Sequence, residues 1–385
     1  MAESSEIYTT QYFHFDDAER PLKLRSGVEM AQFTLAYEMY GEMNAAKDNV
    51  VLLFHALSGS QHAAGFNPEV EGLSVDWTKE CQQGWWDEFV GPGKALNTDK
   101  LCVICINYLG GCYGSTGPSS VDPETGRAFG GSFPRISVSD IVDSQMRLLD
   151  DLGIAKLHAV VGASLGGLMC LSLATRYPER VGIVVALASG IKSSLLQRIH
   201  NFEQIYAIES DADFNGGNYY DGRHPDRGLA AARMISHKTF ISLSTMERRA
   251  SKEIRGIAED SFAWYQIETP LESYIHHQGT KFVKRFDANT YLRIIDAWQS
   301  VDLLADAGLD SYSDLFAPCK HQRYLIFTID SDVCFYPDHQ EQLSQAIQQG
   351  GVTPMRITVH SEKGHDSFLL EPELFTPHIS HLLEG

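Results

Sequence analysis

The feature that most constrains this chain is a Gly-x-Ser-x-Gly motif at residues 162–166. An apolar run at residues 157–161 precedes the motif, and a helical pattern follows it to Arg176. In that order of strand, sharp turn and helix, the motif forms a nucleophile elbow, where glycines are needed because side chains would collide. Ser164 would then lie at a helix N-terminus, where free backbone N–H groups can stabilise an oxyanion. The motif therefore predicts a nucleophilic serine.

The charge balance narrows the range of partners. The 385 residues include 31 Lys and Arg against 50 Asp and Glu, a formal net charge of −19. A surface of that sign repels nucleic acid and anionic membranes, so we expect neither as a partner. No apolar run approaches the ~20 residues of a membrane span, and residues 1–20 lack the apolar segment of a secretory signal. The sequence therefore predicts a cytoplasmic protein.

Continuous apolar runs predict the core of the fold. They occur at residues 49–54, 101–106, 157–161 and 181–187, and further strands are expected at residues 323–329 and 355–360. Runs that are apolar throughout, rather than alternating, are typical of strands buried on both faces of a parallel sheet. An amphipathic helical pattern at residues 137–152 lies between two of them. This alternation predicts an α/β fold with a mostly parallel, doubly wound sheet.

Two segments outside these runs have weaker patterns. Residues 1–20 are polar and are expected to form a loose arm. The glycine-rich residues 107–118 lack the Gly-Lys-Ser/Thr ending of a phosphate-binding loop, and no helical pattern starts directly after them. With Pro118 and Pro123 they predict a rigid surface loop, which is either an ordinary connection or part of a site.

Residues 191–310 differ in character from the rest of the chain. They contain helical patterns and almost no continuous strand signal. The helical patterns cover residues 195–208, 229–244, 245–257 and 287–305. A helical block inserted between α/β units predicts a lid that shapes access to the serine and excludes water. We therefore expect a core of residues 1–190, a lid of residues 191–310 and a second part of the core at residues 311–385.

Later residues can complete the chemistry of the serine, which becomes a strong nucleophile only when a base accepts its proton and an acid orients that base. On an α/β sheet with an elbow, the chain order is Ser, then Asp or Glu, then His. Asp332 and His365 each follow a predicted late strand. His365 would accept the Ser164 proton, and Asp332 would fix the tautomer of the imidazole. Asp330 and Asp338 compete for the role of the acid, and spacing does not separate the three.

Backbone donors for an oxyanion hole are expected at two places. Leu165 directly follows the nucleophile, so its N–H lies at the start of the helix. The second donor should come from the loop after the strand at residues 49–54, where Ala56 or Leu57 is the natural candidate and Leu57 is assigned here.

No metal site is expected from the pattern of histidines. His55 and His62 have no partner cluster that suggests one, and His378 and His381 are typical of a solvated helix face.

Several separated motifs together resemble the homoserine O-acetyltransferase family of acyl-CoA transferases. They are found at residues 55–60, 107–112, 114–118, 133–134, 228–235, 285–289 and 364–371. The resemblance implies an α/β-hydrolase fold with an inserted helical lid, and it selects Asp332 as the acid. It also implies that Arg233 holds the carboxylate of an amino-acid substrate and Asp366 its amino group, pairings that suit a guanidinium and a carboxylate.

The function implied by the resemblance is a ping-pong acyl transfer in methionine biosynthesis. Ser164 would take an acetyl group from acetyl-CoA and pass it to the hydroxyl of L-homoserine, with no permanently bound cofactor. Family members that use succinyl-CoA tend to carry an arginine two residues after the triad Asp, where this chain has Cys334, so acetyl is favoured. The resemblance also implies a homodimer joined through lid helices.

Other functions stay open at this point. The chain is also compatible with a serine O-acyltransferase, a homoserine O-succinyltransferase or an ester hydrolase of the same fold. Arg233 and Asp366 favour transfer over hydrolysis, because a transferase must hold an amino acid. The sequence does not define which residues bind the phosphates of CoA: the basic residues Arg248, Arg249 and Lys252 fit that role and a solvated helix face equally well.

Overall fold

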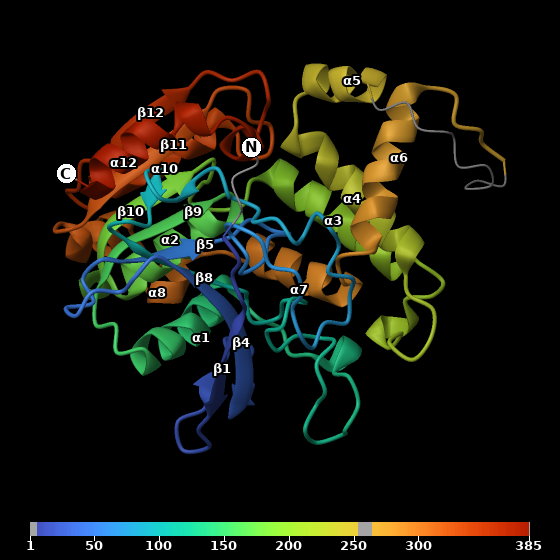
Figure 1. Ribbon diagram of the computed structural model, residues 1–385, viewed down its shortest axis with the longest axis horizontal. Helices are drawn as coiled ribbons and strands as arrows, with labels where there is room; N and C mark the ends of the chain where they lie inside the picture. The colour runs from blue at the N-terminus through green and yellow to red at the C-terminus, as the bar shows by residue number, and fades with distance from the viewer. Residues whose placement is uncertain (1–5, 253–263, 385) are drawn as a thin grey trace.

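A mixed sheet forms the centre of the protein (Figure 1). The structure is a computed structural model that describes residues 6–252 and 264–384, and within them this sheet has eight strands in the order β1-β4-β8-β5-β9-β10-β11-β12. They are β1 (Gln11–Asp16), β4 (Gln32–Tyr40), β5 (Val50–Phe54), β8 (Cys102–Ile106), β9 (Leu157–Ala163), β10 (Val181–Leu187), β11 (Arg323–Ile329) and β12 (Met355–Val359). Only β4 runs antiparallel to its neighbours, β1 and β8, among these pairs. The predicted, mostly parallel sheet is confirmed.

Helices cover both faces of the sheet. Leu52, Ile104 and Val160 belong to the hydrophobic cluster that includes α1 (Val138–Asp151), α2 (Leu165–Arg176) and α10 (Pro337–Gln349). Their neighbours Val51, Val103 and Val161 belong to a second cluster with α12 (Thr376–Glu384). Successive side chains of a strand point to opposite faces, so burial on both faces explains the continuous apolar runs.

The expectation of a loose arm at residues 1–20 is wrong at residues 11–16. Residues 11–16 form β1, which pairs antiparallel with β4 along its length. Phe15 stacks on Phe33 of β4 with a centroid distance of 4.7 Å. Alternating aromatic residues in a polar setting fit an edge strand with one partly buried face, and the polar positions between them obscured that pattern. A short pair, β2 (Leu22–Lys23) and β3 (Glu29–Met30), follows.

The glycine-rich residues 107–118 form a buried loop rather than the predicted surface loop. The loop packs beside β4 and satisfies its backbone there. Asn107 N–H donates to the Ala36 carbonyl at 2.8 Å, and Thr116 N–H donates to the Thr34 carbonyl at 2.8 Å. The Ser115 hydroxyl accepts from Ala36 N–H and donates to the Asn107 carbonyl. A loop can be buried when its polar backbone groups are paired in this way.

The predicted lid, residues 191–310, is helical. Its helices are α3 (Leu195–Glu209), α4 (Asp226–Phe240), α5 (Leu243–Lys252), α6 (Pro270–Val283), α7 (Ala288–Gln299) and α8 (Leu303–Ala307). Helices α3 to α6 gather on the opposite side of the molecule from α12 (Figure 1). The single helix expected at residues 287–305 is instead two, because Asp302 caps a new helix at Ala305 N–H. The helix expected at residues 245–257 is present as α5, and its last predicted residues lie outside the described part.

The lid shares a hydrophobic core with the sheet. Leu229 of α4 and Tyr291 of α7 belong to the same cluster as Leu52 of β5. The division of the chain at residues 190 and 310 stays a prediction. Among the described helices, none combines the length and apolar character that a membrane crossing needs.

Candidate active site

Ser164 occupies the sharp turn between β9 and α2. Its backbone angles are φ 57° and ψ −123°, a strained conformation for a residue with a side chain. A Cβ on Gly162 would lie 2.3 Å from the Gly166 carbonyl oxygen, and one on Gly166 would lie 2.3 Å from the Phe54 carbonyl oxygen. The prediction that the motif needs both glycines is therefore confirmed.

Hydrogen bonds hold the turn in place. Ser164 N–H donates to the Leu187 carbonyl of β10 at 2.9 Å, and its carbonyl accepts from the Ser189 hydroxyl at 2.8 Å. Leu165 is the first residue of α2. The helix therefore provides no carbonyl one turn earlier that could accept a hydrogen bond from its N–H. The turn thus presents a serine side chain and a backbone donor side by side, as predicted for an elbow.

Asp332 lies after β11 and contacts His365, which lies after β12. His365 Nδ1 and Asp332 Oδ2 are 2.8 Å apart, and both side chains are at most 2% exposed. Asp332 Oδ1 accepts hydrogen bonds from Cys334 N–H and Phe335 N–H, each at 2.8 Å. Oδ2, which faces the imidazole, also accepts from Gln340 Nε2 at 3.4 Å. The carboxylate is therefore fixed at both oxygens.

The two competing acids lie elsewhere. Asp330 pairs with His360 at 2.8 Å on the surface, and Asp338 is exposed in the first turn of α10. Among the described residues, the carboxylate hydrogen-bonded to His365 is that of Asp332. The geometry thus separates the three candidates that spacing in the sequence left equivalent.

The surroundings of His365 set its basicity. Burial lowers its pKa, but the charge of Asp332 and the hydrogen bond to it outweigh burial, so the pKa is raised above its ordinary value. Among the described residues, Nε2 of His365 has no hydrogen-bond partner. Phe335 stacks on the imidazole at a centroid distance of 5.6 Å. The ring is therefore oriented by its neighbours, and Nε2 is left available for a proton.

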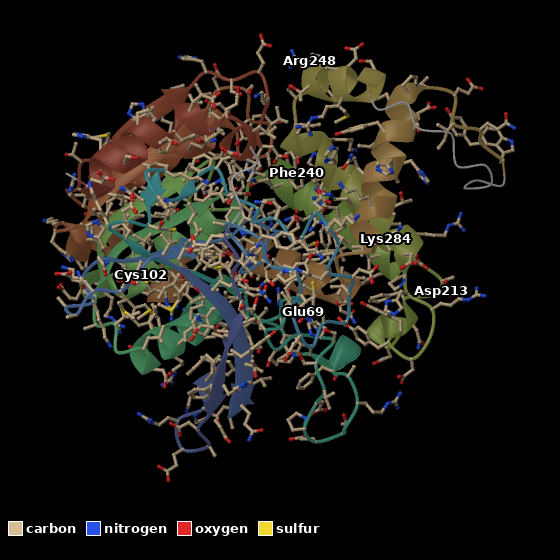
Figure 2. All side chains as sticks on the ribbon, in the orientation of Figure 1. Glu69, Cys102, Asp213, Phe240, Arg248 and Lys284 are labelled. Atoms are coloured by element: carbon tan, nitrogen blue, oxygen red, sulfur yellow. The ribbon has the colours of Figure 1, made fainter. Side chains whose placement is uncertain are left out.

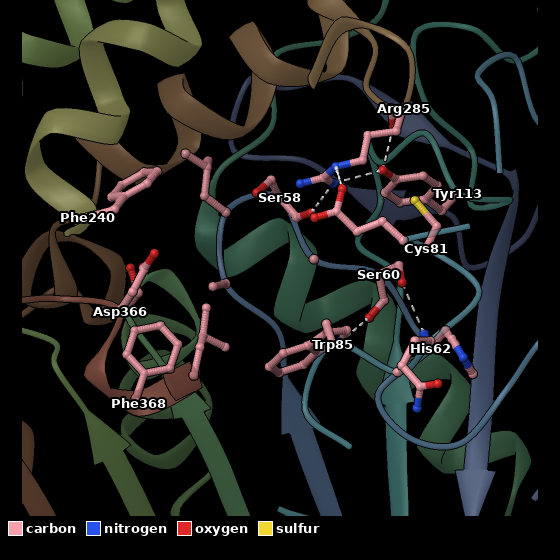
Figure 3. Close-up of a pocket in the computed structure, with 18 of the residues that line it drawn as sticks. Ser58, Ser60, His62, Cys81, Trp85, Tyr113, Phe240, Arg285, Asp366 and Phe368 are labelled. Carbon is pink, nitrogen blue, oxygen red and sulfur yellow. Dashed lines mark hydrogen bonds and ion pairs between the residues drawn. The ribbon is translucent and has the colours of Figure 1, made fainter. Parts of the chain in front are cut away.

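A cavity of about 500 Å³ connects these groups to the lid (Figure 3). It is lined by residues 56–60, His62, residues 80–81 and 83–85, Tyr113, Ser164, Arg233, Phe240, Arg285, Trp298, His365, Asp366, Phe368 and Leu369. Ser164 and His365 both line this space. A cavity of this size suits a small-molecule substrate.

Arg233 of α4 and Asp366 face the same cavity. Among the described residues, neither side chain has an oppositely charged partner within 4.0 Å. The Arg233 guanidinium instead lies over the rings of Phe240 and Phe282, at 5.3 and 4.8 Å from the centroids. Burial lowers the pKa of Arg233 and raises that of Asp366, although His365 and Arg233 oppose the shift of Asp366. Within the described part of the chain, the cavity thus holds a cation and an acid that have no ionic partner.

Backbone hydrogen bonds join the segments that carry these two side chains. Asp366 N–H donates to the Phe240 carbonyl at the end of α4 at 2.8 Å, and Ser242 N–H donates to the Lys363 carbonyl at 3.2 Å. The helix that carries Arg233 is therefore attached to the loop that carries His365 and Asp366.

Leu57 lies in the loop after β5, as expected for an oxyanion donor. The Ala56 carbonyl accepts from His55 Nδ1 at 2.8 Å and from Gly59 N–H at 3.1 Å. The N–H of Leu57 belongs to the same trans peptide and points the opposite way. The N–H of Ala56 is held in the same way, because the His55 carbonyl of its peptide accepts from the Tyr108 hydroxyl. The direction of both candidate donors is therefore fixed, and the choice of Leu57 stays a prediction.

The histidines near this loop have structural contacts. His55 stacks on Tyr108 at 3.7 Å, and burial lowers the pKa of His55 to about 4. His62 Nδ1 lies 2.8 Å from the buried Glu38 carboxylate, and its Nε2 lies 3.1 Å from the Gln82 carbonyl. His378 and His381 are exposed on α12, as predicted.

Sequence reasoning missed several lining residues. Arg285, Tyr113 and Trp298 line the cavity, but only Arg285 lay in a motif that carried a resemblance, and no role was assigned to it. Of the basic residues on α5, Arg248 lies at the outer end of the lid and is 3.7 Å from the exposed Glu362 (Figure 2). Nothing is described for the side chain of Lys252.

Comparisons with known proteins place this geometry in a family. The profile described as alpha/beta hydrolase fold matches residues 49–372. The chain is 41% identical to a homoserine O-acetyltransferase of Methanosalsum zhilinae, over 95% of this chain and 70% of that protein. It is 39% identical to a homoserine O-succinyltransferase of Alkalilimnicola ehrlichii, over 100% of this chain and 97% of that protein.

Solved structures show the same fold. A homoserine O-acetyltransferase from Bacillus anthracis superposes with a TM-score of 0.85 at 24% identity, covering 99% of this chain and 98% of that one. The esterase E22 superposes with a TM-score of 0.82 at 24% identity, covering 98% and 100%. The predicted fold class is therefore confirmed. The chain is an acyltransferase of the α/β-hydrolase fold and belongs to the homoserine O-acetyltransferase family.

Proposed function

We propose that this enzyme transfers an acetyl group from acetyl-CoA to the hydroxyl of L-homoserine, a step of methionine biosynthesis, through an acyl-enzyme on Ser164. The observation that carries the proposal is the cavity in which Ser164 and His365 lie beside Arg233 and Asp366. A nucleophile with its base next to an unpaired cation and an unpaired acid suits an acceptor that is a zwitterionic amino acid.

In the first half-reaction, Ser164 Oγ attacks the thioester carbonyl while His365 Nε2 takes the serine proton. The N–H groups of Leu57 and Leu165 stabilise the oxyanion of the tetrahedral intermediate. The carbon–sulfur bond then breaks, and CoA leaves as a thiol with the proton from His365. Asp332 holds the imidazole and stabilises its charged form. Ser164 is left as an acetyl ester.

In the second half-reaction, homoserine enters with its carboxylate on Arg233 and its amino group on Asp366. Its hydroxyl gives a proton to His365 Nε2 and attacks the acetyl ester. The serine oxygen leaves and recovers that proton, which restores the free enzyme. No permanently bound cofactor takes part in this scheme.

The residue two positions after Asp332 bears on the choice of acyl group. Cys334, a buried neutral thiol, stands two residues after Asp332 and offers no cation for the distal carboxylate of a succinyl group. Acetyl is therefore proposed. The relative named as a succinyltransferase, which covers the whole chain, keeps succinyl as the second candidate.

A steady-state screen of acetyl-CoA and succinyl-CoA against L-homoserine and L-serine tests the proposal. We expect the highest kcat/KM for acetyl-CoA with homoserine, and slow release of free CoA without an acceptor. Thioester cleavage at the same rate with and without homoserine would instead identify a hydrolase. A preference for succinyl-CoA or for serine would correct the donor or the acceptor.

The proposal includes a homodimer joined through the lid. Helix α3 carries a stripe of exposed apolar side chains with helical spacing, namely Leu195, Ile199, Phe202 and Tyr206. Phe202 is 63% exposed and Tyr206 is 65% exposed. A contiguous apolar stripe of this kind on a lid helix suits burial against a second copy.

Sedimentation tests this interface. The wild-type enzyme should sediment as a dimer, and Phe202→Glu should shift it toward the monomer because an unpaired charge would be buried. Val121→Glu changes another apolar residue that is 65% exposed, in the segment between β8 and α1, and should leave the dimer intact. A monomeric wild type, or a dimer that tolerates Phe202→Glu, would remove α3 from the interface.

The proposal also covers the cellular location and the partners of the enzyme. The enzyme acts in the cytoplasm on small molecules, with neither nucleic acid nor membrane as a partner. The net charge of −19 supports the exclusion of nucleic acid and membranes as partners, because a negatively charged protein is repelled by both kinds of polyanionic surface.

A further inference from the structure

Two guanidinium groups line the cavity, but their surroundings differ. Arg233 and Arg285 lie over the ring of the buried Phe282, at 4.8 and 5.0 Å from its centroid. Arg233 has no ionic partner among the described residues, which suits a substrate-binding role. Arg285, between α6 and α7, is only 16% exposed and is already engaged by protein groups. The role of Arg285 therefore depends on its contacts with those protein groups.

Arg285 joins three segments that are far apart in the sequence (Figure 3). Its Nη1 donates to the Ser58 carbonyl at 3.2 Å and to the Tyr113 hydroxyl at 3.3 Å. The Tyr113 hydroxyl in turn donates to the Arg285 carbonyl. Arg285 Nε also lies 4.0 Å from Glu80 Oε2. The same carboxylate oxygen is closer to Lys281 Nζ, at 2.9 Å. The lid, the buried glycine-rich loop and the loop after β5 thus meet at this side chain.

The contact with Ser58 leads to the oxyanion donor through two peptide groups. The Ser58 carbonyl shares its peptide with Gly59 N–H, and Gly59 N–H donates to the Ala56 carbonyl at 3.1 Å. The Ala56 carbonyl shares its peptide with the N–H of Leu57. Because each trans peptide is planar, fixing one end fixes the direction of the other. Hydrogen bonds in such a chain also polarise one another, which strengthens the terminal donor.

We propose that Arg285 is a positioning residue that fixes and polarises the Leu57 N–H of the oxyanion hole through the peptides 58–59 and 56–57. This inference rests on the proposed function, because it takes Leu57 as a donor to the tetrahedral intermediate. It predicts that the lid residue Arg285 acts on transition-state stabilisation in both half-reactions. Arg233, by contrast, acts on the binding of the acceptor.

The test measures the two half-reactions separately. Enzyme in excess is mixed with acetyl-CoA and thiol release is followed; homoserine is then added and product formation is followed. Arg285→Gln should slow both steps by about 10- to 100-fold, less than the loss of an oxyanion donor itself, and leave KM for homoserine largely unchanged. Arg233→Gln should raise KM for homoserine and leave thiol release from acetyl-CoA near the wild-type rate.

Further variants separate positioning from folding. Tyr113→Phe removes one anchor of the guanidinium and should slow both half-reactions to a smaller extent, and Arg285→Lys should recover part of the rate. Lys284→Gln, an exposed neighbouring cation on the lid (Figure 2), is the matched control and should behave as wild type. Rates are normalised to folded enzyme, measured by thermal denaturation.

The outcomes distinguish the inference from the function on which it rests. If wild-type enzyme releases no thiol from acetyl-CoA or succinyl-CoA, the proposed acyl-enzyme and this inference both fail. If wild type is acylated and folded Arg285→Gln is acylated equally fast, only the inference fails. A rise in KM for homoserine with unchanged half-reaction rates would assign Arg285 to acceptor binding and overturn the positioning role.

Discussion

Replacing Ser164 by alanine is expected to abolish acyl transfer, lowering kcat by about 10⁴-fold or more. In the proposed mechanism the acyl group is stored on the serine oxygen between the two half-reactions, and alanine offers no atom to carry it. The turn itself should survive, since alanine needs no more space than serine at φ 57°. After incubation with acetyl-CoA, mass spectrometry should find one acetyl group on the wild-type peptide that contains Ser164. The variant should carry none.

Ser172→Ala provides the control for that experiment. Ser172 lies two turns further along α2, is fully buried and has no hydrogen-bond partner for its hydroxyl within the described part of the chain. Its loss should leave the acyl-enzyme and the turnover intact. An acetyl group that remains on the Ser164→Ala protein, or turnover by that variant near the wild-type rate, would contradict a covalent intermediate at the elbow.

The sequence predicted those parts of the fold that depend on local pattern. Strands buried on both faces appear as continuous apolar runs, and the elbow follows from the volume that Gly162 and Gly166 must leave free. Strand β1 was missed because only one of its faces packs against the core, and that face is partly buried, so polar residues interrupt its aromatic positions. The loop at residues 107–118 was placed on the surface because the hydrogen bonds that allow its burial come from β4, about 80 residues away.

The candidate site could be predicted only in part, because some of its contacts join residues that are far apart in the sequence. The order of Ser164, Asp332 and His365 along the chain is visible in the sequence, but three aspartates satisfy the spacing. Only the hydrogen bond between Asp332 and His365 separates them. Arg285 lay in a motif that carried the family resemblance, yet its contact with Ser58 joins positions 227 residues apart. A local sequence pattern does not reveal a contact between residues so far apart in the chain.

The lid is expected to decide where the acyl group goes. An elbow with a paired histidine is common to esterases and acyltransferases, and the esterase E22 shares this fold. What the lid adds here is Arg233, held beside Asp366 by the bond between Asp366 N–H and the Phe240 carbonyl. An acceptor held by both groups would place its hydroxyl near Ser164 in competition with water, which is an effect of proximity.

Replacing Asp332 by asparagine is expected to lower kcat by roughly 10³- to 10⁴-fold, because asparagine selects the wrong tautomer of His365. Oδ1 of Asp332 accepts two backbone N–H groups, from Cys334 and Phe335. An asparagine oxygen would keep those bonds, so its NH₂ group would face His365 Nδ1. That nitrogen would then have to accept a hydrogen bond, which moves the imidazole proton to Nε2. Nε2 could no longer take the proton of Ser164.

The pH profile gives this variant a second, independent readout. The base must be neutral to act, and Asp332 raises the pKa of His365 above its ordinary value, so wild-type kcat/KM should fall as the pH drops through that raised pKa. Without the carboxylate, burial lowers the pKa, and the acid limb of the residual activity should move to lower pH. Asp330→Asn is the matched control: its partner is the exposed His360, so kcat and the acid limb should stay at wild-type values. An equal loss in both variants would contradict the assignment of Asp332, as would an acid limb unmoved by Asp332→Asn.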